Sequence, residues 1–111
     1  MSLQTTKQPT AANAIQRMVI ELCEIREPSS SERFNVRLMY YDYEWNTQIS
    51  NFTSLGSAEM DILYDFANRA DLFDVSVYSE DGSEIINISK DDYGVWHAFD
   101  KNNPDGYELF Q

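Results

Sequence analysis

The chain has little of the chemistry that most catalytic and metal sites need. Its 111 residues include one cysteine, Cys23, and one histidine, His97. A lone cysteine cannot form a disulfide within the chain, and one cysteine with one histidine does not supply the four ligands of a structural zinc site. The glycine-rich phosphate loop, the Gly-X-Ser-X-Gly nucleophile motif and the His-Glu-X-X-His motif are all missing. We therefore expect no enzyme, no cofactor and no metal ion.

Basic side chains are scarce as well, and long apolar runs are missing. Lys and Arg total 8 against 19 Asp and Glu, which gives a formal net charge of −11 at pH 7. Because nucleic-acid binding normally needs a basic patch, this charge argues against direct contact with DNA or RNA. No apolar stretch approaches the roughly 20 residues that span a bilayer, and the polar residues 1–14 show no signal-peptide pattern. The sequence predicts a cytoplasmic protein that contacts neither nucleic acid nor membrane.

Apolar and aromatic residues are plentiful in spite of the charge. Hydrophobic side chains make up 42% of the chain and aromatic side chains 14%, which is more than a highly charged disordered chain carries. A chain of this length fits one domain, and its folding buries roughly two-thirds of the unfolded surface. We expect the polar residues 1–13, which include Pro9, to form a flexible tail, and residues 14–111 to form a single domain.

The first half of the domain is expected to contain a hairpin. The apolar residues of segment 17–26 fit both the spacing of a helix and the alternation of a strand. Segment 34–40 alternates as a strand does and can continue toward Trp45 or Ile49. A short polar loop joins the two segments. Since adjacent runs joined in this way are typical of a β-hairpin, we interpret both as strands.

A helix and three more strands are expected to follow. Ser57 is a good N-cap, and Glu59 and Asp61 lie in the first turn, where negative charge is favourable. Apolar residues spaced by four run from Ala58 to Ala70, and Leu63 and Ala67 beside them complete a broad apolar face. Segments 73–78, 85–88 and 95–99 read as strands separated by turn signals, and 102–106 reads as a loop. The predicted fold is α+β: an antiparallel sheet in β-β-α-β-β-β order with one helix packed on one face.

The negative charge is concentrated in the later part of the chain. Residues 1–41 carry five basic and four acidic side chains, a balance of +1, whereas residues 42–111 carry three basic and fifteen acidic, a balance of −12. Carboxylates on a helix or strand lie about 5–7 Å apart, and each strand of duplex DNA carries a charge about every 3.4 Å. A display of this kind can therefore substitute for a row of phosphates and steer a basic partner toward itself.

The expected partner-binding carboxylates are Asp61, Asp65, Asp71, Asp74, Glu80, Asp81, Glu84, Asp91 and Asp92. Aromatic side chains at the centre of an interface would add affinity, and the segment around residue 43 mixes aromatic and acidic residues. If Tyr40 faces the core, the alternation of a strand places Tyr41, Tyr43 and Trp45 on the other face, where they are the aromatic candidates.

In size, acidity and aromatic content over residues 42–111, the chain resembles the small acidic DNA-mimic proteins. These include antirestriction proteins, some phage anti-CRISPR proteins and bacterial inhibitors of histone-like nucleoid proteins. These proteins share no common fold or motif, so the resemblance assigns no functional residue to any position of this chain. The resemblance implies a monomer or dimer that inhibits a basic nucleic-acid-binding protein, such as a nucleoid protein or a restriction or CRISPR nuclease. An immunity protein that neutralises a basic toxin nuclease is the alternative, and a solvated acidic surface without a partner is the remaining one.

Overall fold

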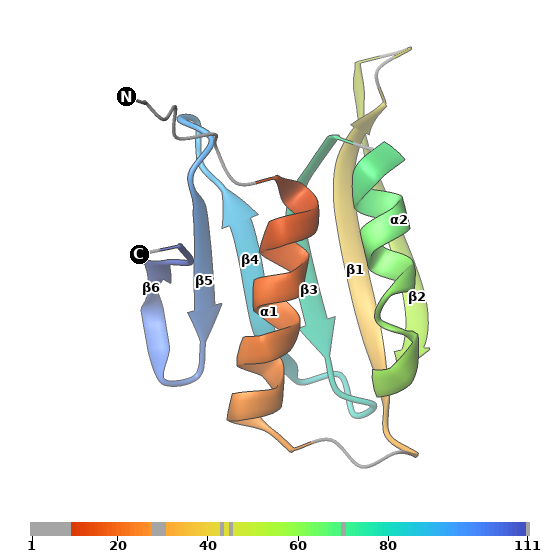
Figure 1. The fold of residues 1–111 in the computed structure, drawn as a ribbon, viewed down its shortest axis with the longest axis vertical. Coiled ribbons are helices and arrows are strands. Elements are labelled where there is room, and N and C mark those ends of the chain that lie inside the picture. The colour runs from red at the N-terminus through yellow and green to blue at the C-terminus, as the bar shows by residue number, and fades with distance from the viewer. Residues whose placement is uncertain (1–9, 28–30, 43, 45, 70, 111) are drawn as a thin grey trace, which may run out of the picture.

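A computed structural model describes residues 10–27, 31–42, 44, 46–69 and 71–110 of the chain. Six strands form one sheet in the order β2-β1-β3-β4-β5-β6, and every neighbouring pair is antiparallel (Figure 1). The expected α+β class is confirmed. In chain order, the elements are α1 (Ala11–Ile25), β1 (Arg33–Asp42), β2 (Thr47–Gly56), the 3-10 helix η1 (Ser57–Glu59), α2 (Ile62–Arg69), β3 (Asp71–Tyr78), β4 (Glu84–Lys90), β5 (Trp96–Asp100) and β6 (Asn103–Glu108).

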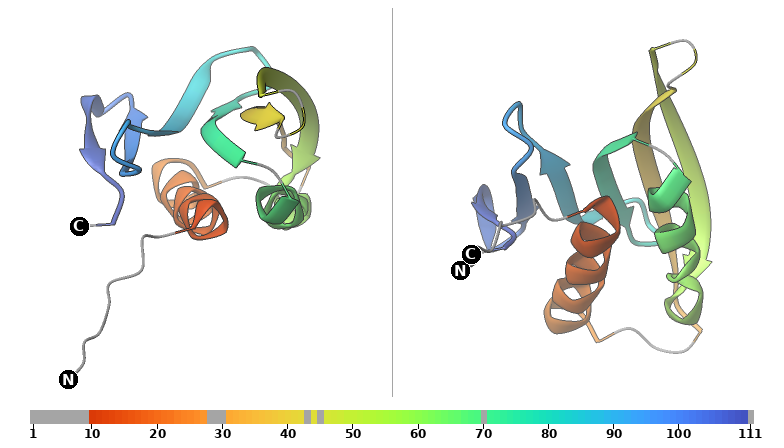
Figure 2. Two further views of the ribbon diagram at one scale, coloured as in Figure 1. Left: turned by 90° about the horizontal axis from the view of Figure 1, so that it is seen from above. Right: turned by 45° about the horizontal axis from the view of Figure 1, so that its top comes forward.

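Two helices, rather than the one we expected, cover the sheet. Both lie on the same side of it (Figure 2, left), and α1 packs against α2, β3 and β4. Since β2 and β3 flank β1 in the sheet, the connection through α2 crosses over β1. The observed order is α-β-β-α-β-β-β-β, which corrects the expected β-β-α-β-β-β order.

The expected strand over residues 17–26 is wrong, because this segment belongs to α1. The Thr10 side chain caps the helix: its Oγ1 accepts the Asn13 N–H at 3.2 Å, and the Asn13 side chain accepts the Thr10 N–H. Met18 and Leu22 are buried, but Ile20, which a strand would place beside them, is 47% exposed. The helical spacing of the apolar residues therefore describes this segment, and their strand-like alternation does not. The helix begins at Ala11, within the segment expected to be a tail, whereas residues 1–9 lie outside the described residues.

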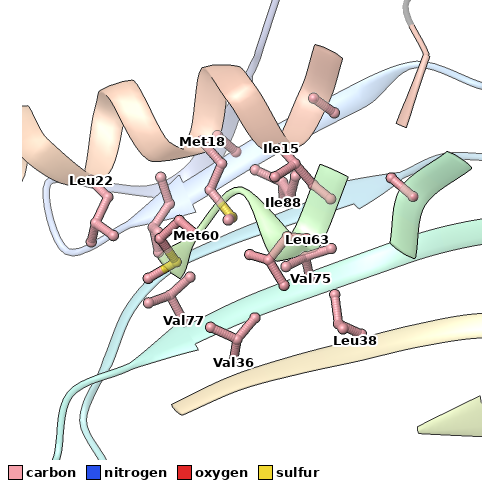
Figure 3. Packing of buried hydrophobic residues seen from close by; sticks show 14 of the residues in the cluster. Ile15, Met18, Leu22, Val36, Leu38, Met60, Leu63, Val75, Val77 and Ile88 are labelled. Carbon is pink, nitrogen blue, oxygen red and sulfur yellow. The ribbon is translucent and has the colours of Figure 1, made fainter. Parts of the chain in front are cut away.

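The core lies between the helices and one face of the sheet. Figure 3 shows side chains of α1 pointing toward those of β1, β3 and β4, with Met60 and Leu63 beside them. α2 turns Leu63 and Ala67 into this core, whereas Ile62 is 52% exposed. The buried face of α2 thus includes Leu63 and Ala67, as expected, but not Ile62 of the row spaced by four.

Two strands were not foreseen. Asn46 has a φ of 51°, which makes a turn directly before β2, so the strand that we expected to continue toward Ile49 is interrupted. Residues 103–108 form β6, although we expected a loop at 102–106. Pro104 is compatible with β6 because this strand is at the edge of the sheet, where a missing N–H does not break the sheet.

The sheet leaves two ends and one uncovered face. We call the end at the bottom of Figure 1 the lower end; it holds η1, the segment before β1, and the β3–β4 and β5–β6 turns. The upper end holds the β1–β2 and β4–β5 turns. The side of the sheet that faces away from both helices is called the open face, since none of the described elements covers it (Figure 2, left).

Candidate functional site

Carboxylates from four segments lie at the lower end. Glu32, Glu80 and Asp81 line a shallow hollow of about 500 Å³ together with Arg26. Arg26 Nη2 lies 2.5 Å from Glu32 Oε2, and Glu80 Oε1 accepts the Arg33 N–H at 3.1 Å. The hollow is therefore acidic, with one of its carboxylates neutralised by an arginine of the same hollow. We refer to Glu32, Glu59, Asp61, Glu80, Asp81 and Glu84 as the acidic end.

Glu59 joins the acidic end through Arg33. Its Oε1 accepts the Gly56 N–H at 2.9 Å and lies 3.1 Å from Arg33 Nη1. The bond from the Gly56 backbone, followed by the charge of Arg33, lowers the pKa of the Glu59 carboxyl. Sequence reasoning assigned Glu59 only to the first turn of a helix. The signal that could have found it is its position three residues after Gly56, the spacing at which a carboxylate caps the start of a helix.

Asp81 is held in the β3–β4 turn by two serines. Its Oδ1 accepts hydrogen bonds from the Ser79 hydroxyl, from the Ser83 N–H at 2.9 Å and from the Ser83 hydroxyl at 2.7 Å. The bond from the Ser79 side chain, followed by those from Ser83, lowers the pKa of Asp81 to about 2. Asp81 is thus ionised and fixed in position, and it remains on the exposed surface of the turn.

Three further carboxylates predicted from the sequence are exposed. Asp61 directly precedes α2 and Asp65 lies one turn later on that helix. Glu84 begins β4 at the lower end, opposite Tyr78 of β3. The structure therefore places Asp61 and Glu84 at the same end of the sheet as Glu80 and Asp81.

Asp71 and Asp74, in contrast, form ion pairs within the chain. Asp71 Oδ1 lies 3.5 Å from Lys90 Nζ. Asp74 Oδ1 lies 3.5 Å from Arg37 Nη2 and accepts a hydrogen bond from Asn87 Nδ2 at 3.0 Å. Both carboxylates are partly buried. A partner would therefore meet little of their charge.

Asp91 and Asp92 lie at the upper end, because the turns before and after β4 are on opposite sides of the sheet. Asp91 Oδ1 accepts the N–H groups of Tyr93 and Val95, both at 2.9 Å, and Oδ2 lies 3.0 Å from His97 Nε2. The Val95 bond, followed by the His97 contact, lowers the pKa of Asp91. This carboxylate thus closes the β4–β5 turn, and it is separated from the acidic end by the length of the sheet.

The aromatic candidates are only partly described. Tyr41 lies on the open face, as predicted, with its ring 4.8 Å from that of Phe73, and its hydroxyl oxygen accepts a bond from Gln48 Nε2 at 3.2 Å. Tyr43 and Trp45 lie outside the described residues. Among the described residues, the most exposed aromatic side chain of the open face is Phe52, which is 66% exposed. It was not foreseen, because β2 was not predicted as a strand.

Neither of the two described helices is long and apolar enough to cross a membrane. Within the described part of the chain, no three His, Cys, Asp or Glu side chains come together in a way that could hold a metal ion. Comparison of the chain with models of protein families, with curated proteins and with solved structures finds no match.

Proposed function

We propose that this chain is an acidic protein-binding module that occupies the nucleic-acid site of a basic DNA- or RNA-binding protein and thereby inhibits that protein. One observation carries the proposal: five basic side chains are already matched within the chain. Each of them lies within 3.5 Å of a carboxylate; they are Arg17, Arg26, Arg33, Arg37 and Lys90. The negative net charge of −11 therefore remains uncompensated within the chain. An electric field of that sign attracts basic surfaces.

The acidic end is the best-supported contact region. Glu80 and Asp81 are each held by hydrogen bonds to the backbone or to side chains, so little conformational entropy is lost when a partner binds them. The charge of Glu59, in contrast, is already matched by Arg33. Glu80 and Asp81 come from the β3–β4 turn, and Glu59 comes from η1, which follows β2. Asp61 and Asp65 extend the same charge along α2.

Affinity capture with matched charge variants tests this function. The wild-type protein is immobilised and a cell lysate is passed over it at low salt, and bound proteins are then eluted with rising salt. The test variant is Asp61→Asn with Glu84→Gln at the lower end. The control is Asp92→Asn with Glu44→Gln at the upper end, which changes the net charge equally and also alters exposed carboxylates.

We expect nucleic-acid-binding proteins to be retained at low salt and released at high salt, since screening weakens contacts between opposite charges. The test variant should release them at lower salt than the wild type, and the control should not. Equal loss in both variants would mean that net charge rather than the acidic end governs binding. Retention of a single nuclease and of no other basic protein would instead favour the alternative, an immunity protein.

A further inference from the structure

The outer edge of β2 is unusually open for pairing. β2 is the first strand of the sheet, so one side of it has no neighbouring strand among the described residues. Segment 47–53 contains no ionisable side chain, no proline and no glycine. Most of its side chains are exposed, including Phe52 at 66%. Exposed edges of this length normally carry a charge, a proline or a bulge that prevents pairing with another chain.

The other edge of the same sheet has these protections. β6 contains Pro104, which has no N–H to donate, and the charged side chains Asp105 and Glu108. Gly106 has a φ of 83°, which bends the strand out of a regular extended path. One edge is thus blocked against strand addition whereas the other is left free, in a chain of which 24% of the residues are charged.

We propose that β2 pairs antiparallel with β2 of a second copy of this chain, across a two-fold axis at Ser50. A two-fold axis perpendicular to the sheet keeps the faces of both copies aligned, so Ser50 faces Ser50 of the other copy and Gln48 faces Phe52. The two sheets then join into one, with all helices on the same side. Strand pairing supplies main-chain hydrogen bonds to an edge that has no neighbouring strand among the described residues.

The uncharged edge of β2 is compatible with a second copy, and the net charge of the chain favours the antiparallel orientation. Segment 47–53 has no carboxylate that would select a basic peptide, and its self-pairing brings no like charges directly opposite each other. Antiparallel pairing directs the acidic ends of the two copies away from each other, whereas parallel pairing would bring them side by side. The Arg33 guanidinium donates to the Ser54 carbonyl at 2.9 Å, so the available part of the edge ends before Ser54.

Sedimentation velocity over a range of protein concentrations tests the pairing, with Ser50→Lys as the test variant and Asn35→Lys as the control. Both positions are exposed and lie on the open face, but Asn35 is on β1, inside the sheet. Both substitutions lower the negative charge of each copy equally. Ser50→Lys places two ammonium groups opposite each other at the axis and should raise the dimer dissociation constant at least about tenfold, whereas Asn35→Lys should not.

Salt separates this inference from the proposed function, on which it does not rest. Added salt should strengthen the dimer, because it screens repulsion between two copies that each carry a net charge of −11. The same salt should weaken a complex with a basic protein. A protein that stays monomeric at every concentration and salt overturns the dimer, and so does a dimer that Ser50→Lys leaves intact. A third outcome also overturns the dimer: the wild type is monomeric, and Ser50→Lys loses binding to a basic partner. The edge of β2 would then pair with a strand of that partner.

A cysteine cross-link provides a second readout that does not depend on the lysine variants. Cys23 is exposed and is first replaced by Ser. In that background Ser50→Cys should form a disulfide between copies on mild oxidation, because the two side chains meet at the axis. Asn35→Cys should remain reduced under the same conditions. Equal cross-linking at both positions would contradict the proposed axis.

Discussion

Arg37 of β1 and Asp74 of β3 face each other on the open face of the sheet, with Nη2 and Oδ1 3.5 Å apart. Arg37 Nη2 also lies 3.2 Å from Ser76 Oγ, and Asn87 Nδ2 contacts the same Asp74 oxygen. An arginine from the basic early segment thus neutralises a carboxylate from the acidic later segment. The difference in net charge between residues 1–41 and 42–111 is therefore reduced on the folded surface, where a partner would bind.

This ion pair gives a prediction on stability. Asp74→Ala should lower the free energy of unfolding by about 1.5–3 kcal/mol, because Arg37 and Asn87 both lose a charged acceptor. Arg37 Nε already lies buried without a hydrogen-bond partner among the described residues, so little rearrangement can compensate. Urea denaturation measures the change. Asp92→Ala, on an exposed turn, is the control and should stay within about 0.5 kcal/mol; equal effects of both variants would contradict the structural role of Asp74.

The N-cap of α1 gives a second prediction. Thr10→Ala should lower the free energy of unfolding by about 1 kcal/mol, because the Asn13 N–H loses its acceptor at the start of the helix. Gln16→Ala, on the exposed side of α1, is the control and should change stability by less than about 0.5 kcal/mol. Thermal or urea unfolding followed by circular dichroism suffices. A Thr10→Ala variant as stable as the wild type would argue against this helix start.

Two glycines with positive φ form a matched pair for a third prediction. Gly82 has a φ of 90° with open space where a Cβ would lie, whereas a Cβ on Gly106, with a φ of 83°, would run into the ring of Phe99. Gly82→Ala should cost about 1 kcal/mol from backbone strain alone. Gly106→Ala should cost at least about 2 kcal/mol, because the Phe99 ring must also move. Equal costs would show that β6 does not pack against Phe99 as described.

The Asp81 carboxyl gives a prediction on pH. Its pKa falls from 3.8 to about 2 on folding, chiefly through the Ser79 hydroxyl, so the folded state favours the ionised form. The stabilisation is therefore fully present above about pH 4 and is lost as the pH falls through about 2. Asp81→Asn should be less stable than the wild type at neutral pH, and the difference should shrink steeply toward pH 2 and vanish below it. A stability difference that is the same at both pH values would contradict this linkage.

Elements that bury an alternating or helical set of apolar residues were predictable. β3, β4 and β5 were foreseen because each has large apolar residues on the core face. β2 was missed because, as an edge strand, it keeps most side chains exposed and has no clear apolar alternation. α1 was predicted as a strand because the apolar residues of segment 17–26 fit both the spacing of a helix and the alternation of a strand. The choice between them depends on the sheet face that the helix must cover, and that is a tertiary effect.

The site was less predictable than the fold, because ion pairing depends on strand register. Arg37 and Asp74 are 37 positions apart in the sequence and meet only because β1 pairs with β3. The same holds for Arg33 and Glu59, which the β1–β2 hairpin and η1 bring together. Asp81, on the other hand, was readable as a turn residue from the following glycine. Turns can therefore be predicted from neighbouring residues in the sequence. The carboxylates that stay unpaired and available to a partner cannot, because ion pairing depends on the register of the strands.

The most direct test of the central claim is competition with nucleic acid for a single site. A basic protein retained by the wild-type chain is bound to a fluorescently labelled DNA or RNA duplex, and the chain is titrated in at low salt while the polarisation is followed. We predict that polarisation falls to the value of free duplex, and that Asp61→Asn with Glu84→Gln requires a higher concentration for the same fall. A rise in polarisation, which reports a ternary complex with the duplex still bound, would contradict nucleic-acid mimicry.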